Sequence, residues 1–234
     1  MDNISFIFKV LWAPGQAMSE VVKRGAIFAP ILLLAFVSLA STFITFRKID
    51  PAAIAIQQSE RQGRQLTAEQ KAQMQQMMNS PILKGVGITF ATIGPLISTT
   101  IITLIFFGIF TLVGREGTFK GFMAVTAHAC VPLVIRLIAG ILTVVMVPID
   151  QIAMDEIGSI SPALFIDRTG MNKMLFTAIN SIDVITIWVL ILLVIGYRFV
   201  TKKSVGTMTR AACVFGLWLL FVAIRVGFSS FIPS

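Results

Sequence analysis

Residues 27–46 read IFAPILLLAFVSLASTFITF, and this stretch contains no charged side chain. An α-helix rises about 1.5 Å per residue, so a run of this length covers the hydrocarbon core of a bilayer, which is roughly 30 Å thick. Similar apolar runs recur along the chain, which predicts an all-α, polytopic transmembrane helical bundle with about five spans. The predicted spans are residues 27–46, 86–113, 122–147, 174–200 and 211–232.

The composition also indicates a bilayer environment. Of the 234 residues, 56% are hydrophobic and 13% are charged, whereas soluble domains carry about 25% charged residues. The net charge of +8 comes from basic residues spread over short loops, without the basic stripe of a nucleic-acid-binding protein. These charges are expected to set the topology and to contact anionic lipid, and no nucleic-acid partner is expected.

The distribution of Lys and Arg predicts the orientation. An odd number of spans places the termini on opposite faces, and the face richer in Lys and Arg is cytoplasmic. Segments 1–26, 114–121 and 198–210 then share one face and are more densely basic than segments 47–85 and 148–183. The N-terminus is therefore predicted to lie inside, although the basic residues of 47–85 favour the opposite orientation.

Two short amphipathic segments flank the first span. Residues 1–26 are predicted to be an interfacial segment before a membrane domain of residues 27–234, and two arrangements fit it: flat on the inner leaflet, or packed under the bundle. Its apolar face comprises Ile4, Ile7, Phe8, Leu11 and Trp12. In the outer loop, Thr67 and Gln70 predict a capping box for a helix that ends before Pro81.

The outer-loop helix carries three methionines, Met74, Met77 and Met78. Methionine clusters can bind copper(I). No histidine or cysteine lies beside them, so the favoured interpretation is a packing stripe that rests this helix on the bundle. No metal site is predicted.

Charged side chains inside the spans mark the candidate site. Arg136 and Arg225 lie about 16 Å and 10 Å from the outer ends of their spans at helical rise, and neither span contains an acid. A lone arginine at such a depth costs at least ~2.5 kcal/mol, so a compensating group is expected. If the fourth span begins near Met174 rather than Val184, Asp183 lies about 14 Å deep and is predicted to pair with Arg136, Arg225 or both.

This polar cluster, completed by Asn180 on the face of Asp183, has three interpretations. The first is a buried ion pair that fixes helix register. The second is an anion or lipid-phosphate site, because two arginines against one aspartate leave a positive excess. The third is that Arg225 extends its side chain to the outer interface.

A second polar feature is predicted at two prolines. His128, Pro132 and Arg136 recur on one face of the third span. Pro132 cannot donate to the His128 carbonyl, so a kink and a free carbonyl are expected there, and Pro95 has the same effect in the second span. Free carbonyls beside a histidine can mark an ion path. A hydrogen-bonded helix contact is the favoured interpretation of His128.

No catalytic motif is visible in the sequence. It contains no G-x-S-x-G, no H-E-x-x-H and no phosphate-binding glycine loop. Cys130 and Cys213 both lie inside apolar runs, which argues against a disulfide or a thiol–metal site. We therefore expect neither an enzyme nor a cofactor.

The chain resembles the YIP (Ypt-interacting protein) family, specifically its bacterial branch. The segments that carry the resemblance are WAP at 12–14, GREGTFKG at 114–121, AHACVPLVI at 127–135, DVITIW at 183–188, and Gly196 with the basic link that follows it. The resemblance implies a five-helix membrane bundle. It supplies no catalytic residues, and GTPase binding, known for eukaryotic relatives, is not carried over because residues 1–26 are short.

Two functional hypotheses follow. In the first, a non-enzymatic multi-pass protein of the inner or plasma membrane acts through helix association and through contacts with lipids, a second copy or another membrane protein. The small-residue pairs Gly94/Ser98 and Ala223/Gly227 permit close helix approach. In the second, a small transporter, channel or lipid-handling protein uses the Arg/Asp cluster as an anion or phosphate site. A polar cavity reaching Arg136 would favour the second, and a closed bundle with paired charges the first.

Overall fold

The computed structural model of the chain describes residues 3–61, 65–147, 157–158, 160–165 and 171–229. Throughout these residues the regular structure is helical, apart from one isolated antiparallel bridge between Arg115 and Thr201. The helices are α1 (Asn3–Trp12), α2 (Pro14–Arg24), α3 (Phe28–Lys48), α4 (Pro51–Arg61), α5 (Ala68–Met78), α6 (Pro81–Val113), α7 (Phe119–Ala129), α8 (Leu133–Met146), η2 (Pro162–Phe165), α9 (Lys173–Asn180), α10 (Val184–Tyr197) and α11 (Thr207–Ser229).

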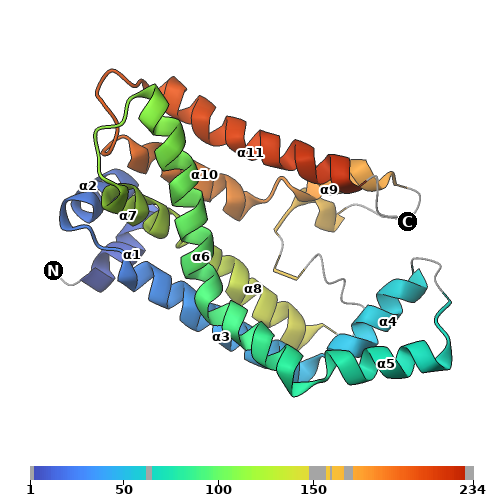
Figure 1. The fold of residues 1–234 in the computed structure, drawn as a ribbon. Helices are drawn as coiled ribbons and strands as arrows, with labels where there is room; N and C mark the ends of the chain where they lie inside the picture. The colour runs from blue at the N-terminus through green and yellow to red at the C-terminus, as the bar shows by residue number, and fades with distance from the viewer. Residues whose placement is uncertain (1–2, 62–64, 148–156, 159, 166–170, 230–234) are drawn as a thin grey trace.

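Four helical stretches in the described residues are long and apolar enough to cross a membrane: Phe28–Lys48, Pro81–Val113, Phe119–Met146 and Thr207–Ser229. A bent pair, Met174–Asn180 with Val184–Tyr197, makes a fifth span if its two helices cross together. The predicted fold class, a polytopic helical bundle, is confirmed. In Figure 1, α3 packs between α6 and α8, whereas α10 packs against α2, α7 and α11.

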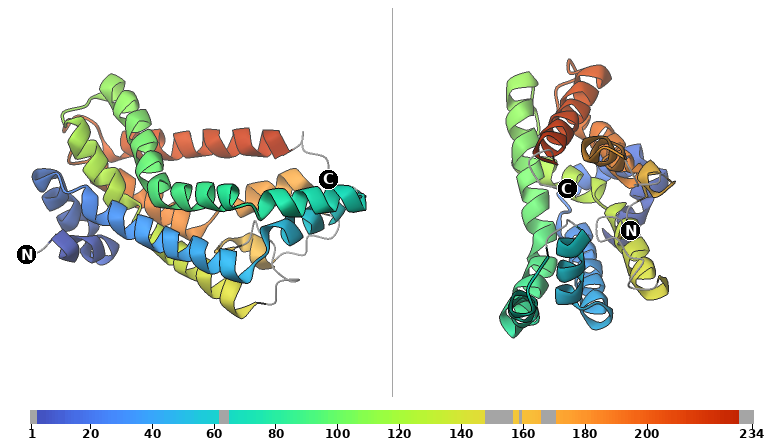
Figure 2. Two further views of the ribbon diagram at one scale, coloured as in Figure 1. Left: turned by 60° about the horizontal axis from the view of Figure 1, so that its bottom comes forward. Right: turned by 90° about the vertical axis from the view of Figure 1, so that its right-hand side faces the viewer.

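The ends of the spans differ from the prediction where capping groups extend a helix. Ser80 caps α6 and Pro81 follows in its first turn, so this helix begins five residues before the predicted residue 86. The last helix, α11, begins at Thr207 instead of 211; residues 230–232 of the predicted span lie outside the described part. Figure 2 shows α6 bent part-way along its length, and Pro95 lies inside this helix.

The third span is broken rather than simply kinked. Residues Cys130, Val131 and Pro132 form turns between α7 and α8. The His128 carbonyl accepts a hydrogen bond from the Val131 N–H at 3.2 Å. The prediction of a free carbonyl at His128 was therefore wrong, because the chain tightens into a turn at Pro132 instead of leaving the carbonyl unpaired.

The N-terminal helices pack against the bundle. On α2, Ala17, Met18 and Val21 are fully buried, and this helix contacts α7 and α10. On α1, Ile7 is buried while Phe8 and Trp12 are 49% and 69% exposed. The predicted single apolar face is thus divided between the bundle and the exterior, and the position of this segment relative to a bilayer stays a prediction.

The loop between α3 and α6 contains two helices, of which the sequence predicted one. The capping box of Thr67 and Gln70 is present in α5, as predicted. The unpredicted helix is α4, and α5 packs mainly against it. Met77 is 61% exposed and no residue of α5 is buried. The prediction that the methionines rest α5 on the bundle was therefore wrong.

The buried centre of the molecule lies where α6, α7 and α10 meet. The rings of Phe106, Phe110 and Phe122 surround Tyr197 with centroid separations of 5.2, 5.2 and 5.3 Å. The Tyr197 hydroxyl lies 3.0 Å from Thr126 Oγ1, and the hydrogen bond between them gives the buried hydroxyl a partner within this apolar cluster. These contacts join α7 to α10 and fix the start of the α10–α11 loop.

The segments predicted to share the inner face lie together at one end of the bundle. The Val200 carbonyl accepts hydrogen bonds from the N–H groups of Glu116 and Gly117 at 3.1 and 2.8 Å, which joins the α6–α7 loop to the α10–α11 loop. On the long helices, large apolar side chains are exposed, as Phe36 (71%) and Leu112 (90%) illustrate. Lipid chains of a bilayer cover such side chains, whereas exposure of so large an apolar surface to water would be unfavourable.

Gly196 is predicted to be required for the packing of α10. A Cβ at this position would lie 2.5 Å from Val125 Cγ1 and 3.2 Å from Met18 Sδ. Gly196→Ala is therefore expected to lower the free energy of unfolding in detergent micelles by about 1–3 kcal/mol. Gly216→Ala is the matched control, because a Cβ there meets no atom within 4 Å. Equal melting temperatures for the two variants would contradict this packing.

Candidate functional site

The predicted fourth span, residues 174–200, is interrupted, and the helix after the interruption begins at Val184, one of the two starts that the sequence allowed. Ser181 ends α9 as its C-cap, Asp183 is the N-cap of α10, and the two helices meet at 55°. The prediction placed Asp183 inside a helix and was wrong. A buried carboxylate needs donors, and an N-cap position supplies backbone N–H groups that a helix interior does not.

The Asp183 carboxylate is bound by backbone donors from two segments. Oδ1 accepts the Thr186 N–H at 3.0 Å, which caps α10. Oδ2 accepts the Ile160 N–H at 2.8 Å, and the Ile160 carbonyl in turn accepts the Val184 N–H at 3.2 Å. Asp183 is only 2% exposed. The carboxylate of Asp183 therefore stabilises the break between α9 and α10 and connects it to the segment around Ile160.

Asn180 supports the same junction from the end of α9. The hydroxyl of Ser161 donates to Asn180 Oδ1 at 2.8 Å. Ser181 donates to the Thr177 carbonyl at 2.7 Å and so satisfies its hydroxyl within the helix end. Asn180 and Asp183 were predicted to share one face of a single helix, but they lie on the two sides of the break.

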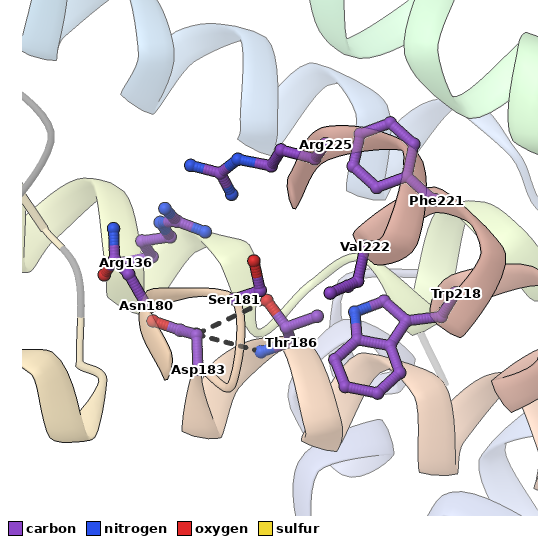
Figure 3. A pocket seen from close by; sticks show the side chains of 9 residues that line it. All are labelled: Arg136, Asn180, Ser181, Asp183, Thr186, Trp218, Phe221, Val222 and Arg225. Atoms are coloured by element: carbon purple, nitrogen blue, oxygen red, sulfur yellow. Dashed lines mark hydrogen bonds between the residues drawn. The ribbon is translucent and has the colours of Figure 1, made fainter. Parts of the chain in front are cut away.

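A cavity of about 200 Å³ lies between α8, the α9–α10 break and α11. Its lining residues are Arg136, Asn180, Ser181, Asp183, Thr186, Trp218, Phe221, Val222 and Arg225. In Figure 3 the guanidinium groups of Arg136 and Arg225 extend into the same space from opposite helices, and Asp183 lies below them at the break. All four residues of the predicted polar cluster thus line one cavity.

The predicted ion pair between Asp183 and these arginines is absent. In the described part of the chain the carboxylates that lie within 4.0 Å of a basic group are those of Glu20 and Glu60. The Asp183 oxygens are directed to backbone N–H groups instead. Arg136 is partly buried and Arg225 is exposed. Among the described residues, the cavity therefore presents two cations, and the one carboxylate that lines it makes no direct contact with either.

Several lining residues were missed from the sequence. These include Trp218, Phe221 and Val222. Together with the predicted Arg225 they recur at i, i+3, i+4 and i+7, which places them on one face of α11. Asn180, Ser181 and Asp183 lie close together in the sequence, and an Asp directly before an apolar stretch is also a helix-start signal.

His128 lies outside this cavity. Its ring is fully buried, and Nδ1 lies 2.9 Å from the Ala124 carbonyl of the same helix. Because a carbonyl only accepts, Nδ1 carries the proton and Nε2 is a bare acceptor in the neutral ring. Nε2 has no hydrogen-bond partner within the described residues. The predicted contact to a neighbouring helix is thus replaced by one within α7.

The cavity lacks the groups of a metal centre. No cluster of three or more His, Cys, Asp or Glu side chains occurs in the segments that the structure describes. What the cavity offers is two guanidinium groups, hydroxyl groups of Ser181 and Thr186, and an aromatic wall from Trp218 and Phe221. Such a lining suits an amphipathic anion, since guanidinium groups bind phosphate and aromatic rings contact apolar groups.

Comparison with protein families identifies the chain. The Yip1 domain matches residues 8–227, which is nearly the whole sequence. The chain belongs to the Yip1 family. This confirms the resemblance seen in the segments around Gly114 and Asp183. No curated protein and no solved structure matches the chain.

The Yip1 match includes the helices that line the cavity. It also includes the break between α7 and α8 and the break between α9 and α10. It begins within α1 and ends at Gly227, two residues after Arg225. The N-terminal helices and the membrane spans therefore form one family domain, and the protein is a multi-pass membrane protein. The cavity is a feature of that domain and not of an appended segment.

The Asp183 cap is predicted to stabilise the break. Asp183→Ala leaves the N–H groups of Ile160 and Thr186 without an acceptor and is expected to cost about 1–3 kcal/mol of unfolding free energy. Asp183→Asn keeps one acceptor oxygen for the cap and is expected to cost less. Denaturant unfolding in micelles measures both. An alanine variant as stable as the wild type would refute the capping role.

Proposed function

We propose that this Yip1-family protein is a non-enzymatic, multi-pass protein of the inner or plasma membrane that binds the phosphate of an anionic phospholipid. The site is the cavity lined by Arg136 and Arg225. The protein would hold or present such a lipid at the α9–α10 break and would catalyse no covalent step. The N-terminus is proposed to lie inside, as the charge distribution predicts.

One observation carries this proposal: two guanidinium groups face one cavity while the nearby carboxylate is occupied by backbone donors. A charge-assisted pair requires direct contact, and among the described residues no carboxylate reaches Arg136 or Arg225. An unpaired arginine within a span costs at least ~2.5 kcal/mol. An external anion would offset that cost, and the phosphate is the anion that a bilayer provides.

The remainder of the cavity supports a lipid rather than a small free anion. Trp218 and Phe221 line it from α11, and Phe221 is 63% exposed. Since α11 contacts the bundle chiefly through α9 and α10, its apolar side chains lie beside the hydrocarbon of the bilayer. A phospholipid whose phosphate contacts the arginines would place its glycerol and acyl groups against this aromatic wall.

Helix association is the second candidate function. A Cβ at Gly94 of α6 would meet no atom within 4 Å, and Ser98 one turn later is exposed. The surface around this small-residue pair is therefore open to a helix of a second copy or of another membrane protein. Cross-linking between cysteines introduced at Gly94 of two copies tests this candidate separately.

The lipid-binding proposal is tested by co-purified lipid. The protein is purified in mild detergent and the bound anionic phospholipid is quantified by native mass spectrometry. Arg136→Gln and Arg225→Gln are each expected to weaken binding roughly tenfold or more, because each removes a hydrogen-bonded charge from the phosphate. The double variant is expected to lose the anionic lipid that this cavity holds.

Arg47→Gln is the matched control for this experiment. Arg47 lies in the last turn of α3, outside the cavity, with its guanidinium carbon 4.5 Å from the centre of the Phe43 ring. Its replacement removes the same charge and is expected to leave lipid binding unchanged. Equal lipid occupancy in wild type and in the Arg136→Gln/Arg225→Gln protein would overturn the proposal.

A further inference from the structure

A second, larger cavity lies at the other end of α10, where the chain turns into α11. It has a volume of about 630 Å³. Its lining residues are Arg198, Phe199, Lys202, Lys203, Val205, Gly206, Thr207 and Arg210. This cavity shares no residue with the Arg136 cavity, so conclusions about the two are independent.

The charged residues that line this cavity in the described part of the chain are all basic. They are Arg198, Lys202, Lys203 and Arg210. Like charges at such proximity repel one another, and this repulsion lowers the stability of the empty loop. An anion in the cavity would convert the repulsion into attraction.

Arg210 gives the cavity a buried, fixed donor. This residue is only 6% exposed. One terminal nitrogen donates to the Val205 carbonyl and the other donates to Thr207 Oγ1 at 2.9 Å. Its Nε is buried and has no acceptor in the described part of the chain. A guanidinium held in this way is oriented before any ligand arrives.

The backbone around the cavity is also fixed in advance. The Lys202 N–H donates to the Gly114 carbonyl at 3.0 Å, and the Val205 N–H donates to the Lys202 carbonyl at 3.0 Å. At Gly206 and Thr207 the chain enters α11, whose first-turn N–H groups have no partners within the helix. Such a helix start attracts negative charge.

We propose that this cavity, which we call the loop site, binds a phosphate group. The loop site comprises Arg198, Lys202, Lys203 and Arg210 with the start of α11. Lysines bind phosphate as point charges and arginines bind it through oriented N–H groups, and the loop site contains both. The phosphate belongs either to an anionic phospholipid headgroup or to a soluble phosphate compound. The loop site lies apart from the Arg136 cavity.

The test compares two charge-removing variants at the same end of the bundle. Lys202→Ala/Lys203→Ala removes two exposed cations of the loop site and leaves the buried Arg210 in place. Lys23→Ala/Arg24→Ala is the matched control, because both residues end α2, lie outside the loop site and contact Glu20 at 3.2 and 4.0 Å. Arg198→Ala is a second loop-site variant with an exposed side chain.

Two probes distinguish the source of the phosphate. The full chain is reconstituted in nanodiscs of phosphatidylcholine with or without phosphatidylglycerol, and in detergent it is titrated with inorganic phosphate. Thermal unfolding reports binding in each case. To isolate the loop site, all proteins also carry Arg136→Gln and Arg225→Gln, so loss of the proposed lipid cavity does not affect the comparison.

We expect Lys202→Ala/Lys203→Ala to weaken binding by about thirtyfold, as the removal of two cations near an anionic surface predicts, and Arg198→Ala to weaken it by about fivefold. The control should bind as the parent does. Stabilisation by phosphatidylglycerol alone would assign a lipid headgroup, and stabilisation by inorganic phosphate would assign a soluble phosphate. Equal responses from the loop-site variants and the control with both probes would overturn the proposal.

Discussion

The hydrogen bonds of the Asp183 carboxylate are the interaction on which the arrangement of α9, α10 and the cavity beside them depends. In an apolar medium, backbone N–H groups at a helix end need acceptors because water is absent. Asp183 supplies them to Thr186 and to Ile160. The helix pair α9–α10 therefore bends by 55° with both of these N–H groups bound, and the bend creates the space beside α8 and α11.

This use of Asp183 determines the electrostatics of the neighbouring arginines. A carboxylate that capped no helix could approach Arg136 or Arg225 and form a buried ion pair. Because its oxygens are directed to backbone donors, the cavity retains a positive excess. The break in the third span also satisfies a backbone group, because the turn at Pro132 lets the His128 carbonyl accept a hydrogen bond from the Val131 N–H. At each break a backbone group that a straight helix would have paired finds a partner nearby. The Thr186 N–H donates to Asp183, and the His128 carbonyl accepts from Val131.

Sequence reasoning located the spans, the intramembrane charges and the Thr67 capping box, because each depends on local composition or on neighbouring residues. It did not locate the break at Ser181, although Asp183 and Thr186 have N-cap spacing. Mean hydropathy averaged over a long window hides the few polar residues at this break, so the segment is predicted as one apolar helix. The Ile160 donor could not be predicted, since it comes from a loop more than twenty residues away whose path depends on tertiary packing.

The most direct test of this account measures what the two arginines contact in a bilayer. Solid-state NMR can record carbon–phosphorus and carbon–carbon couplings from labelled guanidinium carbons in phosphatidylglycerol-containing membranes, with Arg136→Gln and Arg225→Gln proteins used to assign the signals. We predict a phosphorus atom in direct contact with Arg136 and Arg225, and no contact between either guanidinium and the Asp183 carboxyl carbon. A direct Arg–Asp183 contact without phosphorus would contradict the account.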